Sequence, residues 1–305
     1  MFNKLKQGIV LLARLLVVII AMLVAFIVST AVISTGIEMS PEEASQAGGA
    51  ALIVSAINSL ALAYVILRSR WTGVKLIAAV FVVHFGIETF MTQIETLYFN
   101  GSIAMPIDTV IRVIATGLVR ALIFAPLAVL VLGKLKGASM DYKSQPMPAS
   151  EWLKRFVLLA VAYAVIYFVF GYFVAWQWPE VRQYYTGSTA IQLFLTHIMN
   201  TFSGDPVLPL FQILRGVMWA ALALLIVRMT QGETLEKSLV IGVVLAVILA
   251  SGVIFPNPFM PPLVRQGHWY ELSSSMFTFG VIAAWVWTRP SKATPFTKLH
   301  YAKPI

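Results

Sequence analysis

Residues 75–99 read KLIAAVFVVHFGIETFMTQIETLYF, a stretch long and apolar enough to cross a bilayer as one helix. It nevertheless carries His84, Glu88, Gln93 and Glu95. A helix turns by about 100° per residue, so His84, Glu88 and Glu95 fall within about 40° of one another, in a single stripe. Ionisable groups are costly in lipid, so we expect this stripe to face protein or water and to mark a functional site.

The composition of the whole chain is that of a membrane protein. Of its 305 residues, 59% are hydrophobic and only 11% are charged, whereas a soluble domain has roughly 25% charged residues. The net charge of +9 does not indicate nucleic-acid binding, because the basic residues lie in short clusters between apolar runs, as topology signals do. We therefore expect membrane lipid, and no nucleic acid, as a partner. The absence of cysteine excludes disulfides, thiolate metal ligands and cysteine catalysis.

The apolar runs predict an all-α, polytopic integral membrane bundle of about eight helices, with residues 1–305 forming a single transmembrane domain. The predicted spans are 8–33, 49–67, 75–99, 108–133, 156–177, 207–228, 238–255 and 269–288. The first follows a short basic start, as in a signal sequence, but its apolar run is longer than the ~7–15 residues of a signal peptide. We expect it to remain as an uncleaved span.

The basic residues between the spans predict the orientation of the chain. Nearly all lie on one side of the predicted membrane, and the other side holds only Arg182 and Arg265. Short cytoplasmic loops are enriched in Lys and Arg. We therefore expect both termini in the cytoplasm (N-in, C-in) and the protein in the cell membrane, that is, the cytoplasmic or inner membrane.

Two segments on the predicted outer side are more than simple loops. Residues 189–204 predict a short interfacial or re-entrant helix, because their apolar residues share one helical face. These residues are Ile191, Phe194, Leu195, Ile198 and Phe202. Residues 255–268 contain four prolines, which should end the seventh helix and impose an extended path. That path is either a lid or, more simply, a stiff connector.

Charged residues on three spans are predicted to lie near the middle of the bilayer. At ~1.5 Å per residue, Glu88 and Arg120 lie about 18 Å from the outer ends of their spans, and Arg215 about 15 Å. We expect these three to form one buried network or the floor of a polar cavity. Arg112, about 6 Å deep, is expected to pair with Glu95 at about 8 Å.

The predicted substrate-binding residues are therefore Glu88, Arg120, Arg215, His84, Glu95 and Arg112. His84 is the weakest member, since it lies deepest and has no obvious charged partner. The excess of arginine over acid favours an anionic group, because a guanidinium holds carboxylate or phosphate in a fork. The alternative is that a buried Glu–Arg pair only fixes the register of the helices.

A second set of candidates lies at the predicted outer mouth: His197, Arg265, His268 and Glu271. Glu271 shares a helical face with Ser275; alternatively, it lies in the first turn of the last helix, where a carboxylate suits the helix dipole. We expect no metal, because the chain lacks HExxH and the histidines differ in depth. Phosphate-binding glycine motifs and GxSxG are also absent, so we expect no nucleotide cofactor, and no catalytic residue is identified.

Three classes of function remain open. The leading interpretation is a bundle with a mid-membrane charged cavity that binds or transports a small polar or anionic molecule. The first alternative is an intramembrane enzyme acting at the outer leaflet through Glu95, His197, His268 and Glu271. The second is a structural or accessory subunit without catalysis, for which the sequence names no protein partner. The deciding observation is whether Glu88, Arg120 and Arg215 share one pocket.

Overall fold

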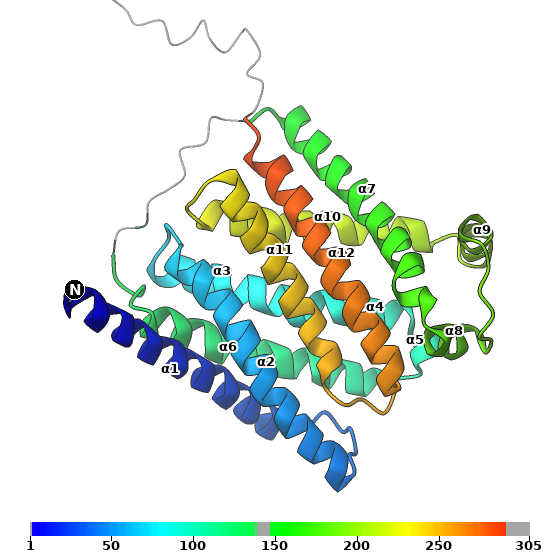
Figure 1. The fold of residues 1–305 in the computed structure, drawn as a ribbon, viewed down its shortest axis with the longest axis horizontal. Helices are drawn as coiled ribbons and strands as arrows, with labels where there is room; N and C mark the ends of the chain where they lie inside the picture. Colours follow the sequence, from blue (N-terminus) through cyan, green and yellow to red (C-terminus); the bar gives the residue numbers. More distant parts are fainter. Residues whose placement is uncertain (1, 138, 140–146, 291–305) are drawn as a thin grey trace, which may run out of the picture.

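The computed structural model describes residues 2–137, 139 and 147–290, and it is a bundle of α-helices (Figure 1). Within these residues the only β-type pairing is an isolated bridge between Ser69 and Thr230. The predicted all-α class is therefore confirmed.

The long helices run back and forth across the bundle. They are α1 (Phe2–Val32), α2 (Pro41–Leu67), α6 (Ile107–Val131), α7 (Ala149–Phe173), α10 (Leu208–Met229), α11 (Thr234–Ser251) and α12 (Pro262–Thr288). A further rod consists of α3 (Gly73–Phe85), the π-helix η1 (Gly86–Phe90) and α4 (Met91–Tyr98). The short helices are α5 (Asn100–Ile103), η2 (Ala175–Gln177), α8 (Pro179–Thr186), α9 (Phe194–Gly204) and η3 (Gly252–Ile254).

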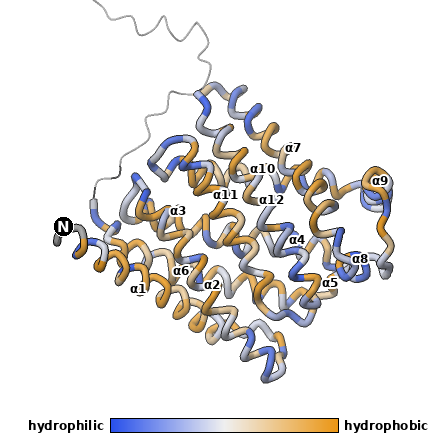
Figure 2. Tube along the Cα trace, in the orientation of Figure 1, coloured by the Kyte–Doolittle hydropathy of each residue, from blue (hydrophilic) through white to orange (hydrophobic). Residues whose placement is uncertain are grey.

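Seven helices within the described residues are long and apolar enough to cross a membrane: α1, α2, the α3–η1–α4 rod, α6, α7, α10 and α11. The protein is thus a multi-pass membrane protein. The eighth predicted span, in α12, is not among them. Figure 2 shows how hydropathy is distributed along the chain: hydrophobic residues run along α1 and α6, and hydrophilic ones lie near helix ends and in α8.

Several helices begin earlier than the hydropathy predicted, and capping explains two of the cases. Ser40 and Glu43 form a capping box that starts α2 at Pro41, eight residues before the predicted span at 49. The predicted extended path over 255–268 is wrong in its second half, because α12 begins at Pro262. Proline suits the first turn of a helix, where its missing N–H has no helical partner.

Helix α12 packs most extensively on α11, and glycines allow the two backbones to approach. A Cβ built on Gly280 would stand 2.6 Å from the Cα of Gly242. Small residues at such contacts are typical of helix pairs in membranes. Helix α7 packs against α10 and α12, while α1 packs against α2 and α6 (Figure 1). The α3–η1–α4 rod, which carries the polar stripe, contacts α2, α6, α10 and α11.

We call the end of the bundle where α2 ends and α3 begins the basic end. Three loops meet there, tied by Arg68 to Glu236 (2.7 Å) and by Lys134 Nζ to the Ser69 carbonyl (2.9 Å). At the same end Arg155 is buried and donates to the carbonyls of Val286 and Arg289, which close α12. A cation there satisfies the free carbonyls of a helix C-terminus.

Helix α9 lies outside the opposite end of the bundle and is seen end-on in Figure 1, across the direction of the long helices. None of its residues is fully buried. The predicted short helix over 189–204 is present but begins at Phe194, so Ile191 precedes it. Of its predicted apolar residues, Phe194 packs on Tyr172 and Phe173 and Phe202 packs on Phe168, while Leu195 is 72% exposed. The face turned to the bundle instead includes His197.

Candidate functional site

The centre of the polar stripe is a π-helical turn. Residues Gly86–Phe90 form η1 between α3 and α4, and Glu88 projects from it. Single π turns inside α-helices are frequent at functional sites. Helix α6 approaches this turn closely, since a Cβ on Gly117 would lie only 2.1 Å from the Thr89 hydroxyl oxygen.

Four helical segments meet at the Glu88 side chain, which is 6% exposed. Glu88 Oε2 lies 3.1 Å from Arg120 Nη1 of α6 and 3.1 Å from His84 Nε2 of α3. Glu88 Oε1 accepts a hydrogen bond of 3.2 Å from Asn58 Nδ2 of α2, and Asn58 also donates to Ser251 of α11. The predicted Glu88–Arg120 pair is confirmed. The expectation that His84 has no partner is wrong, because one helical turn brings its ring to the same carboxylate.

Arg215 does not join this group, contrary to the predicted three-residue network. Its Nη1 and Nη2 donate to the two carboxylate oxygens of Glu95 at 2.7 and 2.6 Å. Nη1 also donates to Gln212 Oε1 (2.9 Å) and Nη2 to the Met91 carbonyl (3.4 Å). The mid-membrane charges are therefore divided between a Glu88 centre and a Glu95 centre on the same rod.

The predicted pair between Arg112 and Glu95 is wrong. Arg112 Nε instead contacts Asp108 Oδ2 at 2.6 Å, and the two side chains are 46% and 73% exposed. Asp108 lies one turn away on the same helix, where two side chains four residues apart are neighbours. Arg112 belongs to the surface of α6 and to neither centre.

His268 and Glu271 of α12 form a third polar group at the end of the bundle opposite the basic end. His268 Nδ1 lies 3.6 Å from Glu271 Oε2, and Ser275 donates to Glu271 Oε1 at 3.4 Å. The predicted shared face of Glu271 and Ser275 is confirmed, and the first-turn alternative is wrong because α12 starts at Pro262. Tyr163 of α7 lies near the Glu95 centre, since its ring centroid is 5.7 Å from the guanidinium carbon of Arg215.

The other two outer candidates have structural surroundings. His197 packs on the rings of Trp176 (4.8 Å) and Tyr172 (5.4 Å), and burial lowers its pKa below the ordinary value. Arg265 donates to the carbonyls of Ile254 and Phe255 and so holds the proline-rich connector. Neither residue meets the Glu271 group. Among the described residues, no three acidic or histidine side chains lie close enough to hold a metal ion.

The two centres contain buried polar atoms with no hydrogen-bond partner among the described residues. At the Glu88 centre these include Asn58 Oδ1, His84 Nδ1 and Arg120 Nε. At the Glu95 centre they are Arg215 Nε and Gln212 Nε2. More than nine-tenths of buried polar groups in proteins have a partner. Sequence reasoning named neither Asn58 nor Gln212, although each is an isolated amide within an apolar span.

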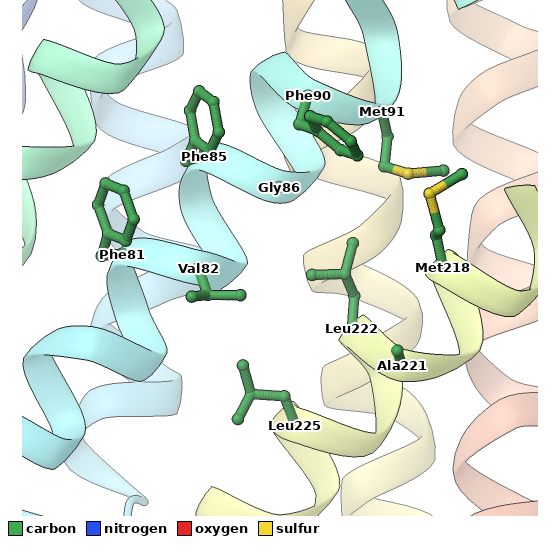
Figure 3. A pocket seen from close by; sticks show the side chains of 10 residues that line it. All are labelled: Phe81, Val82, Phe85, Gly86, Phe90, Met91, Met218, Ala221, Leu222 and Leu225. Carbon is green, nitrogen blue, oxygen red and sulfur yellow. The ribbon is translucent and has the colours of Figure 1, made fainter. Parts of the chain in front are cut away.

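A hollow of about 360 Å³ lies between the α3–η1–α4 rod and α10 (Figure 3). All ten residues that line it are apolar or glycine, among them Phe81, Phe85, Phe90, Met91, Met218 and Leu222. Glu88, Arg120 and Arg215 are not among them. The expectation that the three charged residues share one pocket is therefore not met in this hollow.

Comparison with known proteins adds no assignment. No protein-family model matches the chain, and no curated protein and no solved structure matches it.

Proposed function

We propose that this multi-pass membrane protein binds a small polar or anionic molecule at the Glu88 and Glu95 centres and moves it, or protons, across the cell membrane. The unpartnered buried polar atoms of the two centres carry the proposal. They lie on helices long and apolar enough to span a bilayer, where each unsatisfied polar group costs several kcal/mol. A ligand or a file of water molecules would satisfy them.

In each centre one carboxylate neutralises one arginine, so a bound anion can exchange with the carboxylate. Glu88 faces Arg120 and Glu95 faces Arg215, so an anionic ligand must replace one carboxylate. Glu95 is the group able to leave, because its side chain is 25% exposed whereas Arg215 is 1% exposed. Released from Glu95, the Arg215 fork would hold a carboxylate or phosphate in two parallel hydrogen bonds.

The π turn that carries Glu88 supports a binding site rather than an ion pair that only fixes the register of the helices. A helix whose ion pairs only fixed its position against its neighbours would keep regular α-helical hydrogen bonds. A π turn is a local departure from that pattern. In η1 it carries Glu88 itself, with Gly86 against Leu222 of α10 on one side and Thr89 against Gly117 of α6 on the other.

A structural or accessory role is the second candidate, and the apolar hollow between α10 and the rod favours it. In that case the two ion pairs only lock helices together. The outer-leaflet enzyme is less well supported, because His197 packs on the aromatic rings of Tyr172 and Trp176 and, in the described part of the chain, makes no ion pair with Glu271.

Cysteine accessibility tests the proposal directly, because the natural chain contains no cysteine. Gln93→Cys and Gln212→Cys place thiols at buried polar positions, and Leu62→Cys and Ala79→Cys place them in the apolar core. We expect a membrane-impermeant methanethiosulfonate reagent to modify the first pair and not the second. Equal protection of all four thiols would contradict a water-accessible path and favour the accessory role.

A flux measurement follows from the same proposal. In proteoliposomes loaded with a pH-sensitive dye, the protein should conduct protons under an imposed potential. Glu88→Gln should abolish this flux while the thermal unfolding of the protein stays cooperative. The exposed Lys154→Gln variant, remote from both centres, serves as the control.

A further inference from the structure

The apolar hollow of Figure 3 is lined in part by exposed side chains. Two of its lining side chains, Val82 and Phe90, are 43% and 41% exposed. It lies midway along membrane-spanning helices, where the surroundings are hydrocarbon. Its volume of about 360 Å³ is within the range of small-molecule sites, roughly 300–1,000 Å³. The matching occupant is a hydrocarbon chain.

The hollow ends beside the Glu95 centre. Met91 lines it, and the carbonyl of Met91 accepts a hydrogen bond from Arg215 Nη2. On α10, Met218 and Leu222 follow Arg215 by three and seven residues, so they lie on the adjoining part of the same helix surface. Figure 3 shows the Met91 and Met218 side chains turned toward each other at one end of the hollow.

The groups beyond that end are hydrogen-bond donors. Arg215 Nε and Gln212 Nε2 have no partner among the described residues, and the two side chains are 1% and 0% exposed. Both residues stand on one face of α10, three positions apart. Buried donors around a guanidinium match the oxygens of a carboxylate or phosphate.

From this juxtaposition we infer that the ligand is a long-chain amphiphile with an anionic head. Its hydrocarbon chain lies in the hollow between α10 and the α3–η1–α4 rod, and its carboxylate or phosphate binds Arg215 and Gln212 in place of Glu95. This inference rests on the proposed function and specifies its substrate class. It places the head below the membrane surface, at the level of the Glu95 centre.

Photo-crosslinking in phosphatidylcholine proteoliposomes tests this assignment. Three probes carry the same diazirine- and alkyne-bearing chain: a palmitate, a lysophosphatidate and a neutral monoacylglycerol. We expect the anionic probes to label peptides that contain Met91 and Met218 several-fold more than the neutral probe does. The palmitate and lysophosphatidate arms tell a carboxylate head from a phosphate head.

Two variants test binding of the ligand's hydrocarbon chain and binding of its anionic head separately. Ala221→Trp fills the hollow from an exposed position and should reduce labelling by all three probes to background, whereas Val161→Trp on an exposed face of α7 should leave it unchanged. Gln212→Leu removes a donor without a change in charge and should weaken capture of the anionic probes by about tenfold. Ala221 is exposed, so its variant tests the assignment even if Gln212→Leu fails to fold.

Two results would overturn the inference. Equal labelling by neutral and anionic probes that Ala221→Trp does not reduce would show ordinary boundary lipid only. Absence of capture together with a reactive Gln212→Cys thiol would refute the amphiphile and leave the proposed polar path standing. If that thiol is unreactive as well, both proposals fail.

Discussion

Arg215 and Glu95 form a two-fold hydrogen-bonded ion pair, yet the two partners are buried to different degrees. Arg215 is 1% exposed and Glu95 is 25% exposed. A group left without its partner in the interior keeps its full desolvation cost, whereas one near water can be rehydrated. The two halves of this pair are therefore not equivalent.

Removal of either partner alone should destabilise the protein, and removal of the carboxylate should cost more. Glu95→Gln leaves the buried guanidinium unpaired, which costs about 3–5 kcal/mol for a buried pair. Arg215→Gln leaves a partly exposed carboxylate and should cost less. The double variant should recover most of the loss, as measured by thermal unfolding in detergent.

The pair of Arg68 and Glu236 is the matched control for that experiment. It also has two hydrogen bonds, from Arg68 Nε and Nη2 at 2.7 and 2.8 Å, but its side chains are 43% and 29% exposed. Solvent screens such a pair, so Arg68→Gln should change stability little. Equal losses in Arg68→Gln and Glu95→Gln would contradict the dependence on burial.

The contact of α11 with α12 should depend on a single glycine. Gly280→Leu forces a side chain into the backbone of Gly242, which a Cβ would already approach to 2.6 Å. Overpacking of this kind costs about 1–3 kcal/mol or more, so the unfolding temperature should fall. Gly171→Ala is the control, because nothing lies within 4 Å of a Cβ there. A stable Gly280→Leu variant would mean that the two helices do not pack as described.

The Glu88–Arg120 pair could be predicted from sequence because the outer end of each of the two spans was placed within two residues of its position in the structure. Helix α4 ends at Tyr98, whereas the depth of Glu88 takes Asn100 as the outer end. Helix α6 begins at Ile107, one residue before the predicted span at 108. The predicted depth of about 15 Å for Arg215 takes Asp205 as the outer end of its span, but α10 begins at Leu208. Counted from there, Arg215 lies about 10 Å deep, close to the level of Glu95. An error of one turn was enough to assign the wrong partner.

Other parts of the site could not be predicted from the helical periodicity of the sequence. The role of Asn58 depends on α2 lying beside η1 and α11, and that of Gln212 on how α10 turns toward α4. Neighbours of this kind arise from packing between distant segments, which a single helical pattern does not encode. The helical pattern does not predict the π turn at Glu88 either, because an angle of 100° per residue assumes an unbroken α-helix.

Helix α9 should leave its docked position as the pH falls. Burial against Trp176 and Tyr172 lowers the pKa of His197, so the docked state binds a proton less readily than the undocked state. Docking is then fully favourable above about pH 6.5, the ordinary value of histidine, and weakens as the pH falls toward the lowered pKa.

A nitroxide at Met199→Cys, an exposed position of α9, can report this change. Its mobility should rise between pH 7.5 and pH 5. His197→Phe retains an aromatic ring without a titrating group and should remove the pH dependence. Unchanged mobility in the natural background, or the same rise in His197→Phe, would refute the role of His197.

The orientation of the bundle is testable with two thiols at opposite ends. Glu233→Cys lies in the exposed loop between α10 and α11 at the basic end, and Thr196→Cys is exposed on α9 at the other end. Because Lys and Arg are retained on the cytoplasmic side, we expect a membrane-impermeant maleimide to label Thr196→Cys in intact cells and to spare Glu233→Cys. Permeabilised cells should show labelling of both thiols, which controls for reactivity. The reverse pattern in intact cells would place both termini outside, and the Glu95 centre would then open toward the cytoplasm.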